Sequence, residues 1–396
     1  MSMKPFAPQS SMDSAFQALV GASFQERWDL AKVIPGFGEE AIAPLQKLLQ
    51  HPEAELRWFA ARILGEIDHP HAIALLVELL AVPEEELKVI ASSSLAKLGK
   101  KNISVLSKKL VDPVTRFLAV QALSQIHSAE TIAPLLEVVE DENEMVRVTA
   151  IAALHSYPAP EIIPVFIKGL ADAAASVRQG AVTGLGLVAS RSLAQLARHG
   201  LDTQKLVDIL TPCLRDSSLE VAQQAAIALR RVGNEAAVVS LGEFLINNLL
   251  PNNLDNLDNP DPQTNLIDLQ VLQIEILRQL GWIAQPLASD YLQQSLHHNS
   301  PELWLEIITI LGRVETSKSQ ACRILVTLLQ TNHPGMARTE IRQALASSLG
   351  QLKEPAGRNA LTQLLQDSDR SVQLHSQFAL TLIPSLIPSL ISKEGD

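Results

Sequence analysis

Apolar residues recur along this chain at the three- and four-residue spacing of an amphipathic helix, in short segments separated by polar turns. Within residues 141–154, one helix face carries Val146, Ala150, Ala153 and Leu154. A close relative of this stretch returns 31 residues later, at residues 172–186. Repetition at a fixed interval of about 20 to 50 residues predicts a stack of similar helical units.

Each repeat is expected to contain two helices joined by a short acidic turn. Residues 41–49 are an example of the first helix of a repeat, and residues 56–65 are an example of the second. Aligning the second helices on their alanines and leucines gives one column, called here the arginine column: Arg57, Lys88, Arg116, Arg147, Arg178, Ala222, Gln273, Trp304, Arg342 and Gln373. The pattern predicts an all-α fold, a right-handed superhelical solenoid of about ten helix pairs.

The repeats are expected to extend over residues 40–382 within a single solenoid of residues 13–396. Residues 1–12 carry Pro and Ser and are predicted to be a flexible tail. Helices in residues 13–36 would form an N-terminal cap, and residues 383–396 a C-terminal cap and tail.

Three longer intervals between repeats mark insertions, at residues 190–203, 251–265 and 331–335. The second insertion is rich in Asn, Asp and Pro, which favour turns. It is therefore predicted to be a polar loop that protrudes from the array.

Acidic residues recur six positions before the arginine column, as Asp141, Asp172, Asp216 and Asp367. An aspartate just before a helix can cap its free N–H groups, and an arginine can pair with an acid of the neighbouring repeat. We therefore interpret these charges as a structural ladder along the stack rather than as catalytic groups.

Composition narrows the possible partners. The chain is 47% hydrophobic and 4% aromatic, with a net charge of −11. Nucleic-acid-binding domains usually carry a basic stripe, which is missing here, so no nucleic-acid partner is expected. No apolar run approaches the ~18 residues of a membrane span, and the N-terminus lacks the apolar core of a secretory signal. We expect a cytoplasmic protein without membrane insertion.

Candidate chemistry is sparse. Cys213 and Cys322 lie in separate helical patterns and are interpreted as structural thiols. Gly-x-Ser-x-Gly, Walker and His-Glu-x-x-His motifs are missing from the sequence. His297 and His298 would point about 100° apart on a helix, which does not suit one metal ion. We expect no catalytic residue, no metal and no cofactor.

Partner-binding residues are predicted two, five and nine positions after the arginine column, on the second helices that line the concave surface of a solenoid. The C-terminal half of the chain is expected to carry the main contact, because Trp and Arg favour binding hot spots. The predicted contact residues are Phe59, Arg62, Arg231, Glu275, Arg278, Trp282, Glu306, Arg313, His375 and Phe378.

The recurring Asp…Val-Arg-x-x-Ala-x-x-Ala-Leu-Gly pattern resembles HEAT repeats over about residues 40–382. It is similar to the short repeat of cyanobacterial phycobilin lyases of the E/F type and related phycobilisome-degradation proteins. The run of residues 55–65 also resembles other cyanobacterial HEAT proteins, some of them linked to iron. The chain departs from the pattern in the last five repeats, four of which lack the column arginine.

The resemblance implies a non-catalytic scaffold or adaptor that binds a folded protein on its concave face in a cyanobacterium. The partner would be a phycobiliprotein or another photosynthesis- or iron-related protein. Two alternatives remain open. One is a phycobilin lyase or a factor that handles or degrades phycobilisome chromophores, the only enzyme activity considered. The other is an adaptor in iron–sulfur cluster or iron homeostasis.

Overall fold

The computed structural model describes residues 8–191, 201–249, 266–296, 301–331 and 334–384. Within these ranges, helices are the only regular secondary structure. The chain divides into two compact units, Met1–Gly184 and Leu185–Asp396. The sequence predicted one array over residues 13–396, and the division falls inside the helix α12 (Ala175–Arg191).

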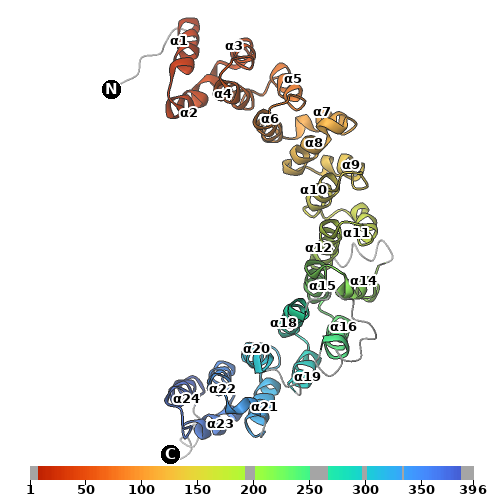
Figure 1. The fold of residues 1–396 in the computed structure, drawn as a ribbon, viewed down its shortest axis with the longest axis vertical. Coiled ribbons are helices and arrows are strands. Elements are labelled where there is room, and N and C mark those ends of the chain that lie inside the picture. Colours follow the sequence, from red (N-terminus) through yellow and green to blue (C-terminus); the bar gives the residue numbers. More distant parts are fainter. Residues whose placement is uncertain (1–7, 192–200, 250–265, 297–300, 332–333, 385–396) are drawn as a thin grey trace, which may run out of the picture. The chain divides into compact units, whose positions relative to one another are not determined.

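The first unit is a series of helix pairs, drawn in red to green in Figure 1. Short 3-10 helices precede several first helices: η1 (Ile34–Ala41), η2 (Gly99–Asn102), η3 (Ala129–Thr131) and η4 (Pro160–Ile162). The pairs are α1 (Pro8–Gly21) with α2 (Phe24–Val33), α3 (Ile42–Leu48) with α4 (Ala54–Leu64), α5 (Pro70–Leu79) with α6 (Glu85–Lys97), α7 (Ile103–Lys109) with α8 (Pro113–Gln125), α9 (Ile132–Leu136) with α10 (Glu144–Leu154), and α11 (Ile163–Gly169) with α12 (Ala175–Arg191).

The second unit continues the alternation of first and second helices (Figure 1). Its short helices are η5 (Thr211–Arg215), the π-helix η6 (Leu245–Leu249), η7 (Pro334–Ala337) and η8 (Pro355–Gly357). The pairs are α14 (Thr203–Leu210) with α15 (Leu219–Val232), α16 (Glu235–Phe244) with α18 (Leu266–Trp282), α19 (Pro286–Ser295) with α20 (Pro301–Leu311), α21 (Lys318–Leu329) with α22 (Thr339–Leu352), and α23 (Arg358–Leu364) with α24 (Arg370–Leu382).

The predicted repeat register is confirmed. Each of the ten positions of the arginine column lies on the second helix of a pair, from Arg57 on α4 to Gln373 on α24. The fold is therefore an all-α solenoid of stacked helix pairs. None of the described helices is both long and apolar enough to span a membrane.

The core lies between successive pairs, where second helices pack directly on one another, as in α4–α6–α8–α10 and α18–α20–α22–α24. Small residues allow this close approach. A Cβ atom added to Gly350 on α22 would lie 2.6 Å from the Cβ of Ala379 on α24. The face of α10 predicted to be apolar is buried as expected, with Val146 and Leu154 among its core residues.

Two predicted boundaries can be compared with the structure. The first helix begins at Pro8, inside the segment predicted as a tail, because proline is favoured in the first turn of a helix. At the insertion predicted for residues 190–203, α12 ends at Arg191 and α14 begins at Thr203, and residues 192–200 lie outside the described residues. The polar loop predicted at residues 251–265 lies outside the described residues, as do His297 and His298.

Candidate functional site

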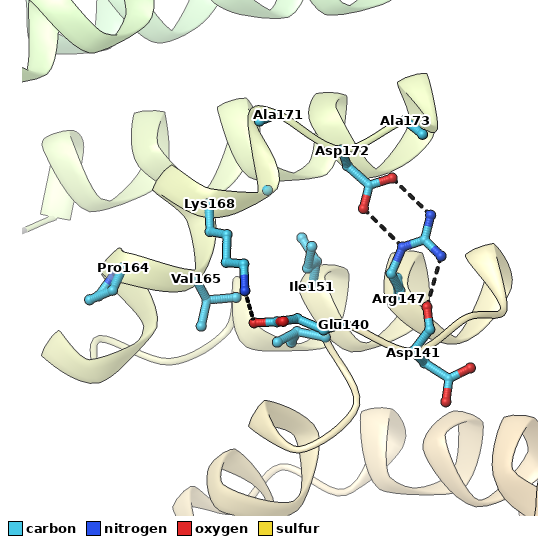
Figure 2. Close-up of a pocket in the computed structure, with 12 residues that line it drawn as sticks. Glu140, Asp141, Arg147, Ile151, Pro164, Val165, Lys168, Ala171, Asp172 and Ala173 are labelled. Atoms are coloured by element: carbon cyan, nitrogen blue, oxygen red, sulfur yellow. Dashed lines mark hydrogen bonds and ion pairs between the residues drawn. The ribbon is translucent and has the colours of Figure 1, made fainter.

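Four arginines of the column each join one helix pair to the next. Arg147 Nη1 donates hydrogen bonds to the carbonyl oxygens of Asp141 at 2.8 Å and Glu142 at 3.1 Å, in the turn before its own helix. Its Nε and Nη2 bind the Asp172 carboxylate of the next pair at 2.9 and 2.8 Å (Figure 2). Equivalent ion pairs are Arg116–Asp141 at 2.6 Å, Arg342–Asp367 at 2.7 Å and Arg57–Glu84 at 3.5 Å. The predicted ladder is confirmed for Asp141, Asp172 and Asp367.

The repeated aspartates shape the turns and do not cap the helices. Asp141 Oδ1 accepts a hydrogen bond from the amide of Asn143 at 2.8 Å, and Asp172 accepts one from Ala174 at 2.8 Å. The cap of α10 is instead Asn143, whose side chain accepts from the Met145 amide at 2.9 Å. The capping role predicted for these aspartates is thus corrected, because they stand two residues before the N-cap.

The arginine ladder also sets the acidity of its aspartates. Burial raises the pKa of Asp172, but the Arg147 guanidinium, the Ala174 amide and the charge of Arg178 outweigh it and hold that pKa below its ordinary value. The hydrogen bond to Asp172 in turn raises the pKa of Arg147. Both side chains are therefore held in their charged forms.

A cavity of about 550 Å³ lies beside this ladder, between α10, α11 and the turns around them. Its wall includes the apolar side chains of Ile151, Pro164 and Val165 (Figure 2). Each charged residue of the wall has an ionic partner: Arg147 with Asp172, Lys168 with Glu140, and Asp141 with Arg116. General acid–base chemistry needs a group free to exchange a proton with a substrate, so this cavity suits binding better than catalysis.

The predicted contact residues occupy very different environments. Phe59 is 0% exposed, because its ring packs in the core against Phe24 and Trp28. Its predicted place on an exposed face is therefore corrected. The other nine are at least partly exposed: Arg62, Arg231, Glu275, Arg278, Trp282, Glu306, Arg313, His375 and Phe378.

The second unit brings two of these residues together on neighbouring helices. Arg278 Nε on α18 donates to Glu306 Oε1 on α20 at 2.6 Å, and this hydrogen bond raises the pKa of Arg278. Glu275, one turn before Arg278, accepts a hydrogen bond from Gln279. Trp282, at the end of α18, is 75% exposed. These side chains form one mixed polar and aromatic surface on α18 and α20.

The remaining predicted residues lie apart from that surface. Arg231 is on α15, where burial, followed by repulsion from Arg230 and Arg191, lowers its pKa. Its Nη1 is buried without a hydrogen-bond partner among the described residues. His375 and Phe378 lie on α24, and Arg313 is exposed in the turn after α20.

The structure also reveals a cluster on α2 and α4 that the sequence prediction missed, apart from Arg62. The Trp28 and Trp58 rings stack with centroids 6.2 Å apart and an interplanar angle of 18°. The Arg62 guanidinium carbon lies 4.1 Å from the Trp28 ring centroid. Phe24, 57% exposed, also stacks on Trp28, with ring centroids 6.1 Å apart.

A sequence signal for this cluster does exist. The dipeptide Arg27-Trp28 stands 30 residues before the identical dipeptide Arg57-Trp58. Arg27 acts as a further column arginine: it donates to the carbonyls of Leu19 and Val20 and pairs with Glu53 of the next pair. The N-terminal cap is thus in register with the repeats, which places its tryptophan next to Trp58.

Similar proteins support the repeat assignment. The family model for HEAT repeats matches residues 12–96, 103–186 and 163–248, together more than half of the chain. The model for the PBS lyase HEAT-like repeat matches residues 341–367. Among curated proteins, none matches the sequence.

Two solved structures of Kap121p agree with this chain in fold. Kap121p bound to Nup53p is 14% identical with a TM-score of 0.58, over 93% of this chain and 45% of that one. A Kap121p mutant is 16% identical with a TM-score of 0.52, over 91% and 42% of the two chains. An engineered protein is 19% identical with a TM-score of 0.35, over 94% and 99%. The chain spans less than half the length of the Kap121p chains.

The family models and the two Kap121p structures agree with the stacked helix pairs. The resemblance to phycobilisome lyases is confirmed at the level of one repeat, residues 341–367 on α22 and α23. HEAT solenoids are typical of protein-interaction scaffolds. The chain belongs to the HEAT-repeat proteins.

Proposed function

We propose that this protein is a non-catalytic scaffold that binds a folded partner protein on the exposed face of its second helices. The observation that carries the proposal is the surface of Trp282, Arg278 and Glu306 on α18 and α20. An exposed tryptophan beside an arginine is the composition typical of a binding hot spot. Burying the Trp282 ring against a partner would remove a large apolar area from water.

The partner surface is expected to complement this arrangement. Arg278 Nε already pairs with Glu306, and the remaining N–H groups of the guanidinium can donate to carbonyl or carboxylate oxygens of the partner. Because this ion pair is partly exposed, it adds orientation more than affinity. Trp282 would supply most of the apolar contact.

Two further observations support a scaffold. The charged residues lining the cavity beside α10 and α11 are engaged with one another, which disfavours acid–base catalysis there. Kap121p, which shares the fold, has been solved bound to another protein, Nup53p. By analogy, the exposed face of this solenoid would serve the same general purpose.

The test is affinity capture of the tagged protein from a cyanobacterial lysate, with mass spectrometry of the bound proteins. The double variant Arg278→Ala and Trp282→Ala should lose a stoichiometric partner that the wild type retains. Arg323→Ala is the matched control, because this arginine is exposed on α21, a first helix. Equal capture by the double variant and the wild type would refute the assigned contact.

A second candidate function rests on the PBS lyase-like repeat at residues 341–367. In that case the protein would be a phycobilin lyase or would handle or degrade phycobilisome chromophores. The same capture experiment distinguishes the two if the visible spectrum of the eluate is recorded. Bilin absorbance with a phycobiliprotein subunit would favour chromophore handling, whereas a colourless eluate with another partner favours the scaffold. An iron–sulfur or iron-related protein would identify the scaffold as an adaptor in iron homeostasis.

A further inference from the structure

The cluster of Phe24, Trp28, Trp58 and Arg62, here called the aromatic–arginine surface, has the features of a second docking site. It holds two of the four tryptophans of a chain that is only 4% aromatic. Phe24 is 57% exposed, and the two tryptophans and Arg62 are half-buried. On α6, the position that corresponds to Trp58 is Val89, which is also exposed. An apolar strip therefore crosses the second helices of the first pairs.

The charges around this surface leave one group unsatisfied. The neighbouring acids are engaged in ion pairs: Glu66 with Lys97, Asp29 with Lys32, and Glu53 and Glu55 together with Arg27. Arg62 has no hydrogen bond or ion pair with any residue in the part of the chain that the structure describes. Its guanidinium plane stacks on Trp28, but the N–H groups around the edge of that plane are available.

This geometry selects one class of ligand. A cationic ligand such as a lysine side chain is disfavoured, because Arg62 already occupies the face of Trp28 that would attract it. Nucleic acid is disfavoured because a row of phosphates needs several cationic contacts, whereas this surface offers the single guanidinium of Arg62. A carboxylate is the complementary group, since a guanidinium binds it through two parallel hydrogen bonds while remaining stacked on an aromatic ring.

We propose that the aromatic–arginine surface docks an acidic segment of a partner protein. A carboxylate of that segment binds the free edge of Arg62, and an adjacent aromatic or aliphatic side chain packs on Trp58 and Phe24. The inference extends the proposed scaffold function to a second contact, located in the first unit. It does not depend on the surface formed by Arg278 and Trp282.

The experiment selects ligands from a random peptide library displayed on phage, using the full-length protein as bait. Enriched peptides are then synthesised and their Kd values measured by fluorescence anisotropy. The expected peptides combine Asp or Glu with a neighbouring aromatic or aliphatic residue. Arg62→Gln should weaken their binding about tenfold or more, as expected for loss of a charge-assisted hydrogen-bond pair.

Further variants distinguish the role of Arg62 from that of other exposed arginines. Arg62→Lys keeps the charge but not the planar fork, so it should bind with intermediate affinity. The Arg278→Ala and Trp282→Ala double variant and the Arg323→Gln control should bind the peptides like the wild type. Because that double variant tests the proposed scaffold contact, the two proposals can fail separately. Thermal unfolding monitored by circular dichroism verifies that each variant is folded.

Several outcomes would overturn the proposal. They are no enrichment, enrichment of peptides without acidic residues, and equal affinity for wild type and Arg62→Gln. Two other occupants have their own signatures. Binding that appears only after deletion of residues 1–7 would identify a segment of this chain as the occupant. Self-association that Trp58→Ala abolishes, measured by sedimentation, would identify a second copy.

Discussion

Arg147 donates two parallel hydrogen bonds to the carboxylate of Asp172, from Nε to Oδ2 at 2.9 Å and from Nη2 to Oδ1 at 2.8 Å. Its remaining Nη1 holds the carbonyl oxygens of Asp141 and Glu142 in the preceding turn. A single guanidinium thus closes the turn of its own helix pair and fixes the position of the next pair. The spacing between pairs depends on polar geometry as well as on the apolar core.

Replacing Arg147 by alanine is expected to destabilise the protein by about 1–3 kcal/mol, because Asp172 and two turn carbonyls lose their partner in a partly buried site. The paired side chains are only 14% and 16% exposed. Arg147→Lys should be nearly as harmful, since an ammonium cannot bind in the bidentate manner. Urea unfolding followed by circular dichroism measures both effects.

The control for this experiment is Lys32→Ala, which breaks an ion pair with Asp29 whose side chains are both 63% exposed. An exposed pair of this kind contributes little to stability, because water and salt screen it. If Arg147→Ala cost no more than Lys32→Ala, the ladder would have no role in holding the stack together.

The ladder also predicts a dependence of stability on pH. Burial raises the pKa values of Asp172 and Asp367, but the hydrogen bonds from Arg147 and Arg342 and from backbone amides hold both below their ordinary value of 3.8. A carboxyl whose pKa is lowered by folding contributes stability above its unfolded pKa. It loses that contribution as the pH falls through the folded pKa.

Near neutral pH both carboxyls stay ionised, so their titration should not change the unfolding temperature there. Below about pH 4 they become protonated, and the unfolding temperature should fall. Asp172→Asn should lower stability at neutral pH, because the ion pair is lost, and should flatten the acid limb of the profile. The measurement is thermal unfolding across the acid range. Parallel profiles for the variant and the wild type would contradict the assignment.

The ladder could be predicted from the sequence because its aspartate and arginine recur at the same positions in successive repeats. A fixed six-residue offset between aspartate and arginine, repeated in register, requires only the period to be read. The interaction of Arg62 with Trp28 was not predictable in the same way, because this combination of residues does not recur at the repeat period. Recognising it requires the cap to be aligned with the repeats through Arg27-Trp28.

The error at Phe59 has a different physical cause. The helical period places it near the edge of the exposed stripe, and α2 packs against that edge. Whether a boundary position faces solvent or a neighbouring helix depends on the rotation of each helix against its neighbour. That rotation is set by side-chain volumes across the interface, which a single sequence does not specify.

The close packing of α12 on α11 leaves no room for a side chain at Gly184. A Cβ atom at this position would lie 2.6 Å from Cε2 of the buried Phe166 ring on α11. Gly184→Ala should destabilise the protein by about 1–3 kcal/mol through overpacking, which exceeds the gain of about 1 kcal/mol in helix propensity. Urea unfolding provides the measurement.

The matched control is Gly21→Ala, because a Cβ atom at Gly21 has nothing within 4 Å. That variant is expected to be neutral or slightly more stable. Equal stability of the two alanine variants would mean that α11 and α12 are packed less closely than the structure indicates.

The two cysteines should differ sharply in reactivity. Cys322 on α21 is 0% exposed, and burial, assisted by the nearby charge of Glu354, raises the pKa of its thiol to about 11. Because the thiolate is the nucleophile, roughly a thousandth of Cys322 would be reactive at pH 8 even if the reagent could reach it. Cys213 in η5 is half-buried and accessible to small reagents.

Iodoacetamide at pH 8, followed by peptide mass spectrometry, should therefore modify Cys213 first, and Cys322 should react at a comparable rate only after unfolding in urea. Rapid labelling of Cys322 in the native protein would show that α21 opens readily and that the core of the second unit is less stable than its packing implies.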